Sequence, residues 1–250
     1  MSSLQDLEHS SSEHGTKAEL VCEVFSELAP KYERFNTIAS FGIYKSWEHA
    51  LVKEASSGAP VSRVLDIAAG TGKISCLLAQ RLKLDHIQVT DFCKEMLDVA
   101  QMHYMKLKVE DKISCSMEFE VQDAHKLSHP DESFDMITVA YGIRNFEDRM
   151  QAMREAHRVL KTGGKYLILE FSHPKCPPWR ALYHSYLRLV IPSLGRLMIG
   201  KQEGFDYFKE SILNFPNREV LIDELKQIGF RDVRCKSLSG GIVCLFSAIK

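Results

Sequence analysis

The 250-residue sequence predicts an α/β protein built on one seven-stranded, mostly parallel sheet with an antiparallel C-terminal strand and helices on both faces. Three observations support this prediction. Seven short runs rich in β-branched and aromatic residues follow residue 60, helical patterns separate the first five runs, and a short glycine-containing link joins the last two. Strands that alternate with helices pair in parallel, whereas a short link of this kind forms an antiparallel hairpin.

The elements follow in order along the chain. Residues 1–17 have low hydrophobicity and no periodicity, so we expect a mobile tail before a single domain at 18–250. Apolar residues at helical spacing from Ala18 to Pro30, and a second helical stretch after Trp47, predict an N-terminal helical lid over 18–57. The predicted strands are Val64–Ala68, His86–Phe92, Met117–Asp123, Met136–Tyr141, Lys165–Phe171, Val233–Ser237 and Ile242–Ala248. The later helical patterns are Gly72–Arg81, Lys94–Met105, Asp148–Leu160, Pro178–Met198 and Asn217–Ile228, the last two within an expected helical insertion at 174–230.

Composition excludes several classes of protein. With 32 basic and 33 acidic side chains the net charge is −1, which argues against nucleic acid as the main ligand, because phosphate binding needs a basic excess. No stretch reaches the roughly 18 uncharged apolar residues of a membrane-spanning helix, and no secretory signal opens the sequence. The seven scattered cysteines contain no C-x-x-C pair, so we expect free thiols in a reducing compartment and no metal site.

A glycine turn follows the first predicted strand. Asp66 lies within that strand, and Gly70 and Gly72 complete the pattern D-x-A-x-G-x-G before a helix begins. Glycine lets the backbone approach a ligand closely at this edge of a parallel sheet. The spacing is not G-x-G-x-x-G, and no Lys-Ser/Thr follows, which excludes a nucleoside-triphosphate loop. Taken alone, the turn could equally be an ordinary strand–helix connection.

Acidic residues also end the second and third predicted strands. A carboxylate at Asp91 can accept hydrogen bonds from both hydroxyls of a ribose, and Asp123, followed by Ala124, can reach an adenine amino group. Either aspartate alone could be a solvated loop carboxylate. Three such features at three successive strand ends predict an adenosine-containing cofactor. The strand order, five parallel strands and then an antiparallel pair, matches the Rossmann-like class I methyltransferase arrangement.

Several further stretches match signatures of one family. They are Tyr32-Glu33-Arg34-Phe35-Asn36 followed by Ser40, Tyr44 and Trp47; Tyr141–Asn145 with Asp148; Arg158–Gly164 followed by Leu167–Ser172; Glu210–Ile212 with Pro216; and Gly229-Phe230 with Ser239–Val243. Through them the chain, from about Phe25 to Lys250, resembles the UbiE-like ubiquinone/menaquinone biosynthesis C-methyltransferases, which use S-adenosylmethionine. Three departures from the family pattern bear on the methyl acceptor: Tyr44 replaces a histidine, Ala140 a serine, and Lys73 an acidic residue.

The resemblance implies the ligands of the protein, its oligomeric state and its location in the cell. The cofactor is expected to be S-adenosyl-L-methionine, and the acceptor a polyprenylated benzoquinol or naphthoquinol. The implied cofactor contacts are Asp66, Gly70, Thr71, Gly72, Asp91, Phe92, Asp123, Ala124 and Ala140. Thr71 could also be the N-cap of the following helix. The resemblance further implies a homodimer in the cytoplasm, peripheral at the inner membrane, or on the matrix side of a eukaryotic mitochondrion.

Methylation of a quinol ring carbon requires loss of a ring hydroxyl proton, so a base or cation should lie near that hydroxyl. Arg144, just past the fourth strand, is the candidate that stabilises the quinolate or orients a water, with Tyr141 and Asn145 orienting Arg144 or the ring. Alternatively, Arg144 is a surface cation paired with Asp148. Side chains expected to contact the acceptor are Tyr32, Asn36, Tyr44 and Arg144, although Tyr32 and Trp47 could be helix-packing aromatics.

The segment Trp179–Met198 interleaves apolar side chains with Arg180, Arg188 and Arg196. We expect it to cap the sheet and to border the entrance for a prenyl tail, resting on a membrane surface. Two rival functions stay open. One is a related small-molecule methyltransferase with a different acceptor, and the other is a non-catalytic subunit of a quinone-synthesis complex.

Overall fold

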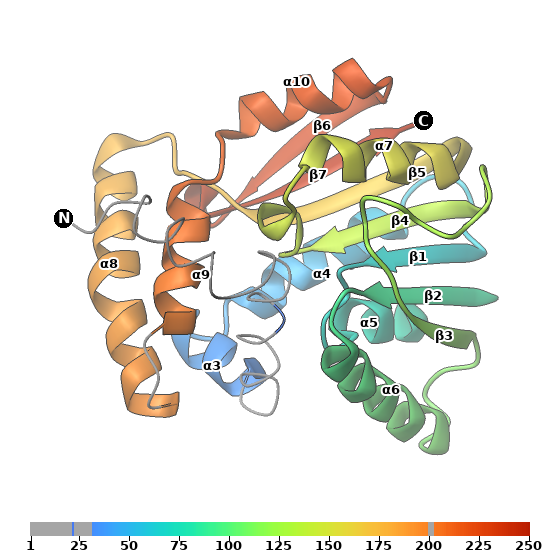
Figure 1. Ribbon diagram of the computed structural model, residues 1–250, viewed down its shortest axis with the longest axis horizontal. Coiled ribbons are helices and arrows are strands. Elements are labelled where there is room, and N and C mark those ends of the chain that lie inside the picture. The colour runs from blue at the N-terminus through green and yellow to red at the C-terminus, as the bar shows by residue number, and fades with distance from the viewer. Residues whose placement is uncertain (1–21, 23–31, 200–202) are drawn as a thin grey trace, which may run out of the picture.

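The computed structural model describes residue 22 and residues 32–199 and 203–250 (Figure 1). The tail expected at 1–17 and the helical pattern expected from Ala18 to Pro30, apart from residue 22, lie outside these residues. Within the described part no helix is both long enough and apolar enough to cross a membrane.

One seven-stranded sheet runs through the domain in the order β3-β2-β1-β4-β5-β7-β6. Its strands are β1 (Arg63–Ile67), β2 (His86–Asp91), β3 (Ser116–Val121), β4 (Phe134–Ala140), β5 (Leu160–Phe171), β6 (Arg231–Leu238) and β7 (Val243–Ile249). β7 pairs antiparallel with β5 and β6, and the pairs from β3 to β5 are parallel. The predicted sheet, its seven strands and its C-terminal hairpin are therefore confirmed. The strand order reverses between β1 and β4, the place where ligands bind in open α/β sheets.

β5 begins five residues before the expected start at Lys165. The pairing of β4 with β5 shifts register, since Phe134 faces Leu160 while Met136 faces Lys165. Gly163 has φ +79°, which a glycine adopts at low cost, so the extra residues bulge from the strand. A strand with a bulge loses its alternating pattern, which explains why the sequence did not reveal this part.

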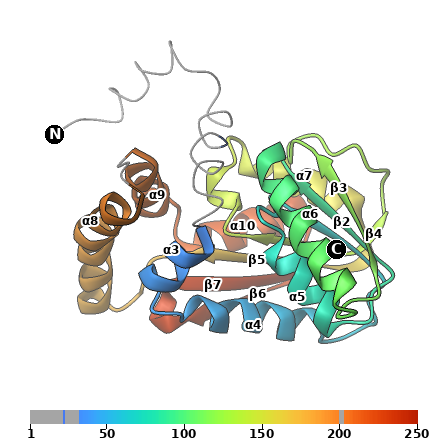
Figure 2. The same cartoon turned by 90° about the horizontal axis from the view of Figure 1, so that it is seen from below.

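Helices cover both faces of the sheet (Figure 2). α4 (Tyr44–Ala55), α5 (Lys73–Arg81) and α6 (Lys94–Val109) lie on one face, and α7 (Arg149–Val159) and α10 (Arg218–Ile228) on the other. Leu51, Leu78 and Leu167 belong to the core on the first face, and Met153 and Leu221 to the core on the second. The helix predicted at Asn217–Ile228 begins and ends as expected, with Asn217 at the N-cap and Gly229 left-handed at the C-cap.

A third group of helices gathers beyond one end of the sheet (Figure 1). It comprises α3 (Tyr32–Ala39), α8 (Pro177–Ile199) and α9 (Glu203–Leu213), which share a core of their own. The sequence predicted α8 but neither α3 nor α9. Gly195 of α8 leaves no room for a Cβ beside the ring of Phe205, and Tyr186 Oη donates to Ala39 O (2.5 Å). Phe205, Phe208 and Ile212 of α9 recur at helical spacing and contribute to this core, so a local pattern for α9 is present in the sequence although the prediction did not include it.

Candidate active site

A cavity of about 810 Å³ opens at the carboxyl ends of the parallel strands and extends towards α3, α4 and α8. This volume lies in the usual range for a ligand site. Twelve side chains or backbone groups predicted from the sequence line it: Asn36, Tyr44, Asp66, Gly70, Thr71, Asp91, Phe92, Asp123, Ala124, Ala140, Tyr141 and Asn145. Sequence reasoning therefore placed most of its candidates around one cavity.

Three predicted residues do not line the cavity. The side chain of Tyr32 lies outside the described part of the chain. Gly72 is the N-cap of α5 with φ +69°, and a Cβ there would lie 2.8 Å from the Cβ of Ala100, so this glycine lets α5 pack closely on α6. The N-cap role suggested for Thr71 is wrong for the same reason. The third residue, Arg144, is buried outside the cavity lining.

Asp91 is held by the backbone on both sides. Its Oδ2 accepts a hydrogen bond from Gly70 N (2.8 Å), and its Oδ1 accepts one from Cys93 N (2.9 Å). Burial raises the pKa of Asp91 above its ordinary value, while these N–H donors oppose the rise. A carboxylate offers about four acceptor sites. The remaining acceptor capacity can receive the hydroxyls of a ribose, which fits the predicted cofactor.

Asp66 supplies a second, deeper carboxylate. It accepts hydrogen bonds from Ser75 Oγ (2.5 Å) and Thr138 Oγ1 (2.6 Å) and is almost wholly buried. Burial raises the pKa of Asp66 to about 6, although both hydroxyl groups lower it. At neutral pH the cavity wall thus carries a buried anion, which would hold the ammonium group of an amino-acid moiety.

Asp123 lies at the exposed rim of the cavity. Its Oδ1 accepts from His125 N (2.9 Å) and lies 2.5 Å from His125 Nδ1. Ala124 is buried beside it, and Phe92 exposes nearly half of its surface on the β2 side. This part of the cavity thus combines apolar side chains with a carboxylate, the kinds of group that can contact an adenine ring and its amino group.

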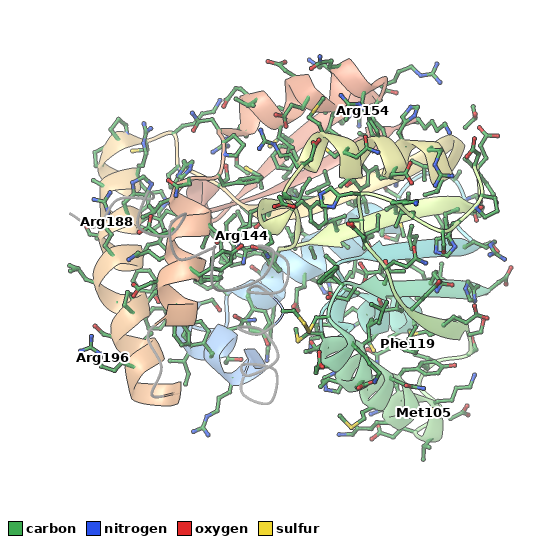
Figure 3. The ribbon with its side chains drawn as sticks, in the orientation of Figure 1. Met105, Phe119, Arg144, Arg154, Arg188 and Arg196 are labelled. Atoms are coloured by element: carbon green, nitrogen blue, oxygen red, sulfur yellow. A yellow bond between two sulfur atoms is a disulfide. The ribbon has the colours of Figure 1, made fainter. Side chains whose placement is uncertain are left out.

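Arg144 is buried behind the cavity wall and does not line it (Figure 3). Its Nη1 pairs with Glu170 Oε1 (3.1 Å), its Nε donates to Ser211 Oγ (3.2 Å), and a further N–H donates to the carbonyl of Tyr141. The guanidinium also lies 5.4 Å from the ring of Phe171. The alternative that Arg144 pairs with Asp148 is wrong, because Asp148 instead caps α7.

Arg144 fixes the segment that does face the cavity. Tyr141 has φ +59°, an uncommon conformation for a non-glycine residue that costs of order 1–3 kcal/mol and often occurs at functional sites. The Arg144 guanidinium binds the carbonyl of Tyr141, and the Tyr141 ring packs 5.2 Å from that of Phe171. Asn145 Oδ1 accepts from Tyr207 Oη (3.1 Å). Both cavity-lining side chains are thereby held in place.

For the apolar wall, the sequence predicted only the α8 segment, as the border of the entrance for a prenyl tail. This part of the cavity is lined by Phe35, Phe171, Tyr183, Leu187, Ile191 and Phe208. Tyr183, Leu187 and Ile191 recur every four residues on α8, so the helical period of this segment held a signal for a cavity-facing stripe. Trp47 both packs in the core and lines the cavity, and its Nε1 donates to Ser239 Oγ (2.8 Å).

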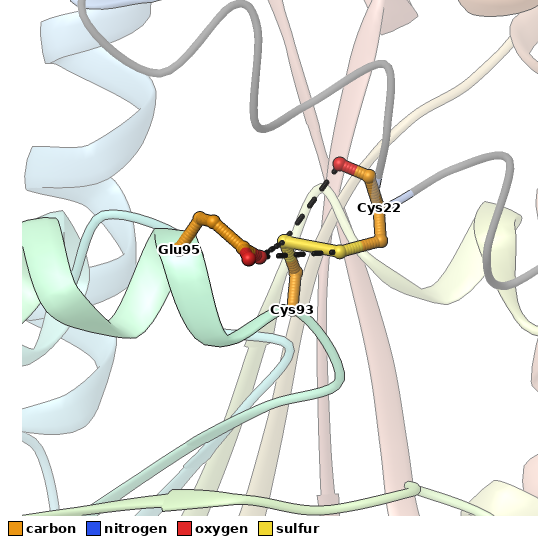
Figure 4. Close-up of side chains that lie close together, drawn as sticks. All are labelled: Cys22, Cys93 and Glu95. Carbon is orange, nitrogen blue, oxygen red and sulfur yellow. Dashed lines mark hydrogen bonds between the residues drawn. A yellow bond between two sulfur atoms is a disulfide. The ribbon is translucent and has the colours of Figure 1, made fainter.

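The expectation that all cysteines are free is also wrong. Cys22 and Cys93 form a disulfide on the cavity wall (Figure 4). The other five, Cys76, Cys115, Cys176, Cys235 and Cys244, carry no disulfide. The bonded residues are 71 positions apart, and neither lies in a motif that would predict the pairing.

Known proteins resemble the chain over nearly its whole length. Residues 13–250 match the ubiE/COQ5 methyltransferase family. The chain belongs to this family. The ubiquinone/menaquinone biosynthesis C-methyltransferase UbiE of Rickettsia bellii is 38% identical over 238 residues, which is 94% of each chain. The demethylmenaquinone methyltransferase of Bacteroides fragilis is 35% identical over 239 residues, 96% of each.

The fold is shared more widely. A crystal structure of a SAM-dependent methyltransferase from Thermotoga maritima superposes with a TM-score of 0.61 at 18% identity, covering 91% of this chain and 99% of that one. The predicted family, the class I methyltransferase fold and the cofactor S-adenosylmethionine are thus confirmed, and the protein is an S-adenosylmethionine-dependent methyltransferase. The carboxylates of Asp66 and Asp91 and the turn at Gly70 are the groups that fit this cofactor.

Proposed function

We propose that the protein transfers a methyl group from S-adenosylmethionine to a ring carbon of a polyprenylated benzoquinol or naphthoquinol. The observation that carries this proposal is the division of one cavity into two unlike parts. Asp66, Asp91 and Asp123 line a polar part, and the aromatic and aliphatic side chains of α3, α8 and α9 line an apolar part. A ring with a prenyl tail is mostly apolar, so it suits the apolar part of the cavity. The two relatives are named for the biosynthesis of ubiquinone and menaquinone, which covers both quinone classes.

S-adenosylmethionine supplies the electrophilic methyl group when bound, so the protein must orient the ring and exclude water. Tyr141 and Asn145 follow β4 and line the cavity, and we assign them contact with the ring oxygens. Asn36 and Tyr44 line the cavity from α3 and α4, and we assign them contact with the opposite side of the ring.

We assign Arg144 a positioning role rather than contact with the ring. Its charge is balanced by Glu170, and its side chain is 1% exposed, so direct contact with the acceptor would require this ion pair to open. As a positioning residue it holds the carbonyl of Tyr141 and, through it, the geometry of the segment from Tyr141 to Asn145. A guanidinium has only N–H donors and no acceptor atom, so Arg144 is not suited to take the proton itself.

An exposed apolar patch borders the cavity and supports the peripheral membrane contact. Phe41 in the turn between α3 and α4 is 82% exposed, Ile43 is 47% exposed, and Leu182 of α8 is 60% exposed; all three line the cavity. Arg188 and Arg196 project from α8 on the side away from the sheet (Figure 3). Exposed apolar side chains together with cations on the same helix, α8, favour an anionic bilayer surface, which would bring the cavity to a membrane-dissolved quinol.

Methyl transfer from radiolabelled cofactor to prenylated demethylmenaquinol and to prenylated methoxybenzoquinol tests the proposal. We expect turnover of at least one of them, and a rise in KM when the prenyl chain is removed, because the apolar wall then loses its ligand. A protein that binds S-adenosylhomocysteine normally but methylates neither quinol would have a different acceptor. A folded protein that does not bind it at all would be a non-catalytic subunit.

A further inference from the structure

The hydroxyl group of Tyr183, on α8, has no hydrogen-bond partner within the described part of the chain. Its oxygen is buried, and the residue as a whole is 6% exposed. A buried hydroxyl that makes no hydrogen bond destabilises the folded protein, so it calls for an explanation. Tyr183 lines the cavity, and a bound ligand can therefore supply the missing partner.

Two neighbouring tyrosines have hydroxyl groups that bind within the protein. Tyr186 Oη, on the same helix, donates to Ala39 O (2.5 Å), and Tyr207 Oη of α9 donates to Asn145 Oδ1 (3.1 Å). These two hydroxyls hold elements of the fold together. The hydroxyl of Tyr183 makes no such bond, so it is available to a ligand.

Tyr183 lies close to the buried ion pair between Arg144 and Glu170. Burial is the main cause that raises the pKa of Tyr183, while Arg144 lowers it and Glu170 raises it, so both charges act on the hydroxyl. Leu187 and Ile191 follow on the cavity-lining stripe of α8, about 6 Å and about 12 Å further along the helix. A prenyl tail can follow these aliphatic side chains while the ring stays beside the tyrosine.

The protonation state of Tyr183 decides which role its hydroxyl can have. Because the pKa is raised, the hydroxyl keeps its proton at neutral pH and acts as a hydrogen-bond donor, not as a base. Loss of a ring hydroxyl proton leaves negative charge on an oxygen of the quinol. A fixed donor in a buried site stabilises such a charge strongly.

We propose that Tyr183 Oη donates a hydrogen bond to the ring oxygen of the quinol that loses its proton, and so stabilises the quinolate during methyl transfer. This inference rests on the proposed function and adds a catalytic residue from α8 to Tyr141 and Asn145. Binding of the acceptor completes the hydrogen bonding of a side chain that has no partner without it.

Methylation of the ring releases one proton overall. The quinol oxygen gives its proton to solvent, and the electron pair left behind is delocalised onto the neighbouring ring carbon. This carbon bonds to the methyl group as the methyl–sulfur bond breaks, and the electron pair of that bond stays on sulfur. The ring carbon then loses its hydrogen as a proton, while the oxygen regains one.

Tyr183→Phe removes only the hydroxyl group and tests the hydrogen bond without turnover. Calorimetry in saturating S-adenosylhomocysteine measures binding of 2-farnesyl-4-nitrophenol, a prenylated phenol that is ionised at about pH 9 and neutral at about pH 5. At pH 9 the wild type should bind it at least about tenfold more tightly than the variant does, and at pH 5 the difference should be smaller. Equal affinities of the two proteins at pH 9 would overturn the proposal.

Stability separates this role from a structural one. In urea unfolding, cofactor-free Tyr183→Phe should be at least as stable as the wild type, because an unpartnered buried hydroxyl is removed. Tyr186→Phe is the matched control, since it breaks the bond to Ala39 O and should unfold at a lower urea concentration. A Tyr183→Phe protein that is less stable than the wild type and keeps full turnover would overturn the proposal.

Turnover of a prenylated quinol gives the last comparison. Tyr183→Phe should lower kcat about 100-fold and leave the affinity for S-adenosylhomocysteine unchanged. Tyr104→Phe, on α6 and outside the cavity lining, should keep the kcat of the wild type. If the wild type methylates neither quinol but the two proteins differ at pH 9, the contact of Tyr183 with a phenolate is supported and the quinol is overturned as the acceptor.

Discussion

Replacing Arg144 by methionine leaves Glu170 as an unpaired carboxylate at the centre of the domain. Glu170 is fully buried, and its burial already raises its pKa against the opposing effect of Arg144. Without the guanidinium the carboxyl group must fold in its protonated form. Protonating a group whose unfolded pKa is about 4.3 costs about 3.7 kcal/mol at pH 7 and about 1 kcal/mol at pH 5. The estimate at pH 7 agrees with the roughly 3–5 kcal/mol seen when buried ion pairs are broken.

The direction of the pH dependence follows from linkage. A carboxyl group whose folded pKa is raised destabilises the protein above its unfolded pKa, and the loss disappears as the pH falls below that value. Urea unfolding of the cofactor-free protein should therefore show that Arg144→Met lowers the free energy of unfolding by about 4 kcal/mol at pH 7 but by only about 1 kcal/mol at pH 5.

Two further variants identify the cause. Adding Glu170→Gln to Arg144→Met removes the buried charge, so most of the stability at pH 7 should return. Arg149→Met is the matched control, because it breaks the partly exposed pair between Arg149 and Glu224 and should cost less than about 1 kcal/mol at either pH. A loss for Arg144→Met that is equal at both pH values would refute the reasoning. If the double variant regains stability without turnover, Arg144 serves the site as well as the fold.

Three other predictions concern the cavity. Asp91→Ala should weaken S-adenosylhomocysteine binding by about 100-fold or more in calorimetry, because two hydrogen bonds to a charged group are lost. The control, Asp98→Ala on the exposed side of α6, should leave the affinity unchanged. Since the pKa of Asp66 is about 6, affinity should fall about tenfold from pH 7 to pH 5 as this carboxylate is neutralised, and Asp66→Asn should remove that dependence. Phe41→Ser should reduce sedimentation with anionic vesicles, while Val109→Ser, equally exposed on α6, should leave it unchanged.

The polar part of the site could be predicted because it depends on the sheet. Strands and helices leave periodic patterns, and the carboxyl ends of parallel strands meet at one edge. The sequence alone therefore predicts that Asp66, Gly70, Asp91 and Asp123 lie around one site, and all four line the cavity. Gly72 also lets α5 pack on α6, and in sequence a glycine needed for helix packing looks like one needed for a ligand.

The remaining features depend on contacts between distant residues. The ion-pair partner of Arg144 is Glu170, which is 26 residues away but buried beside it, and not Asp148, which is near in sequence. The Cys22–Cys93 pair and the notch for Phe205 at Gly195 are likewise products of the folded chain. Each joins segments that carry no shared local pattern, so a single sequence gives no basis for pairing them.

The cofactor end and the acceptor end of the cavity belong to different parts of the fold, so they can change independently. The carboxylates that fit the cofactor are fixed by strands with continuous backbone pairing, whereas the apolar wall belongs to α3, α8 and α9, which share a separate core. A substitution in that core changes the shape of the acceptor end without disturbing the sheet that holds Asp66 and Asp91. Arg144 links the two parts, since it contacts Glu170 of β5 and Ser211 of α9. Changes of acceptor should therefore arise among the residues of α3, α8 and α9, while loss of Arg144 should impair both parts together.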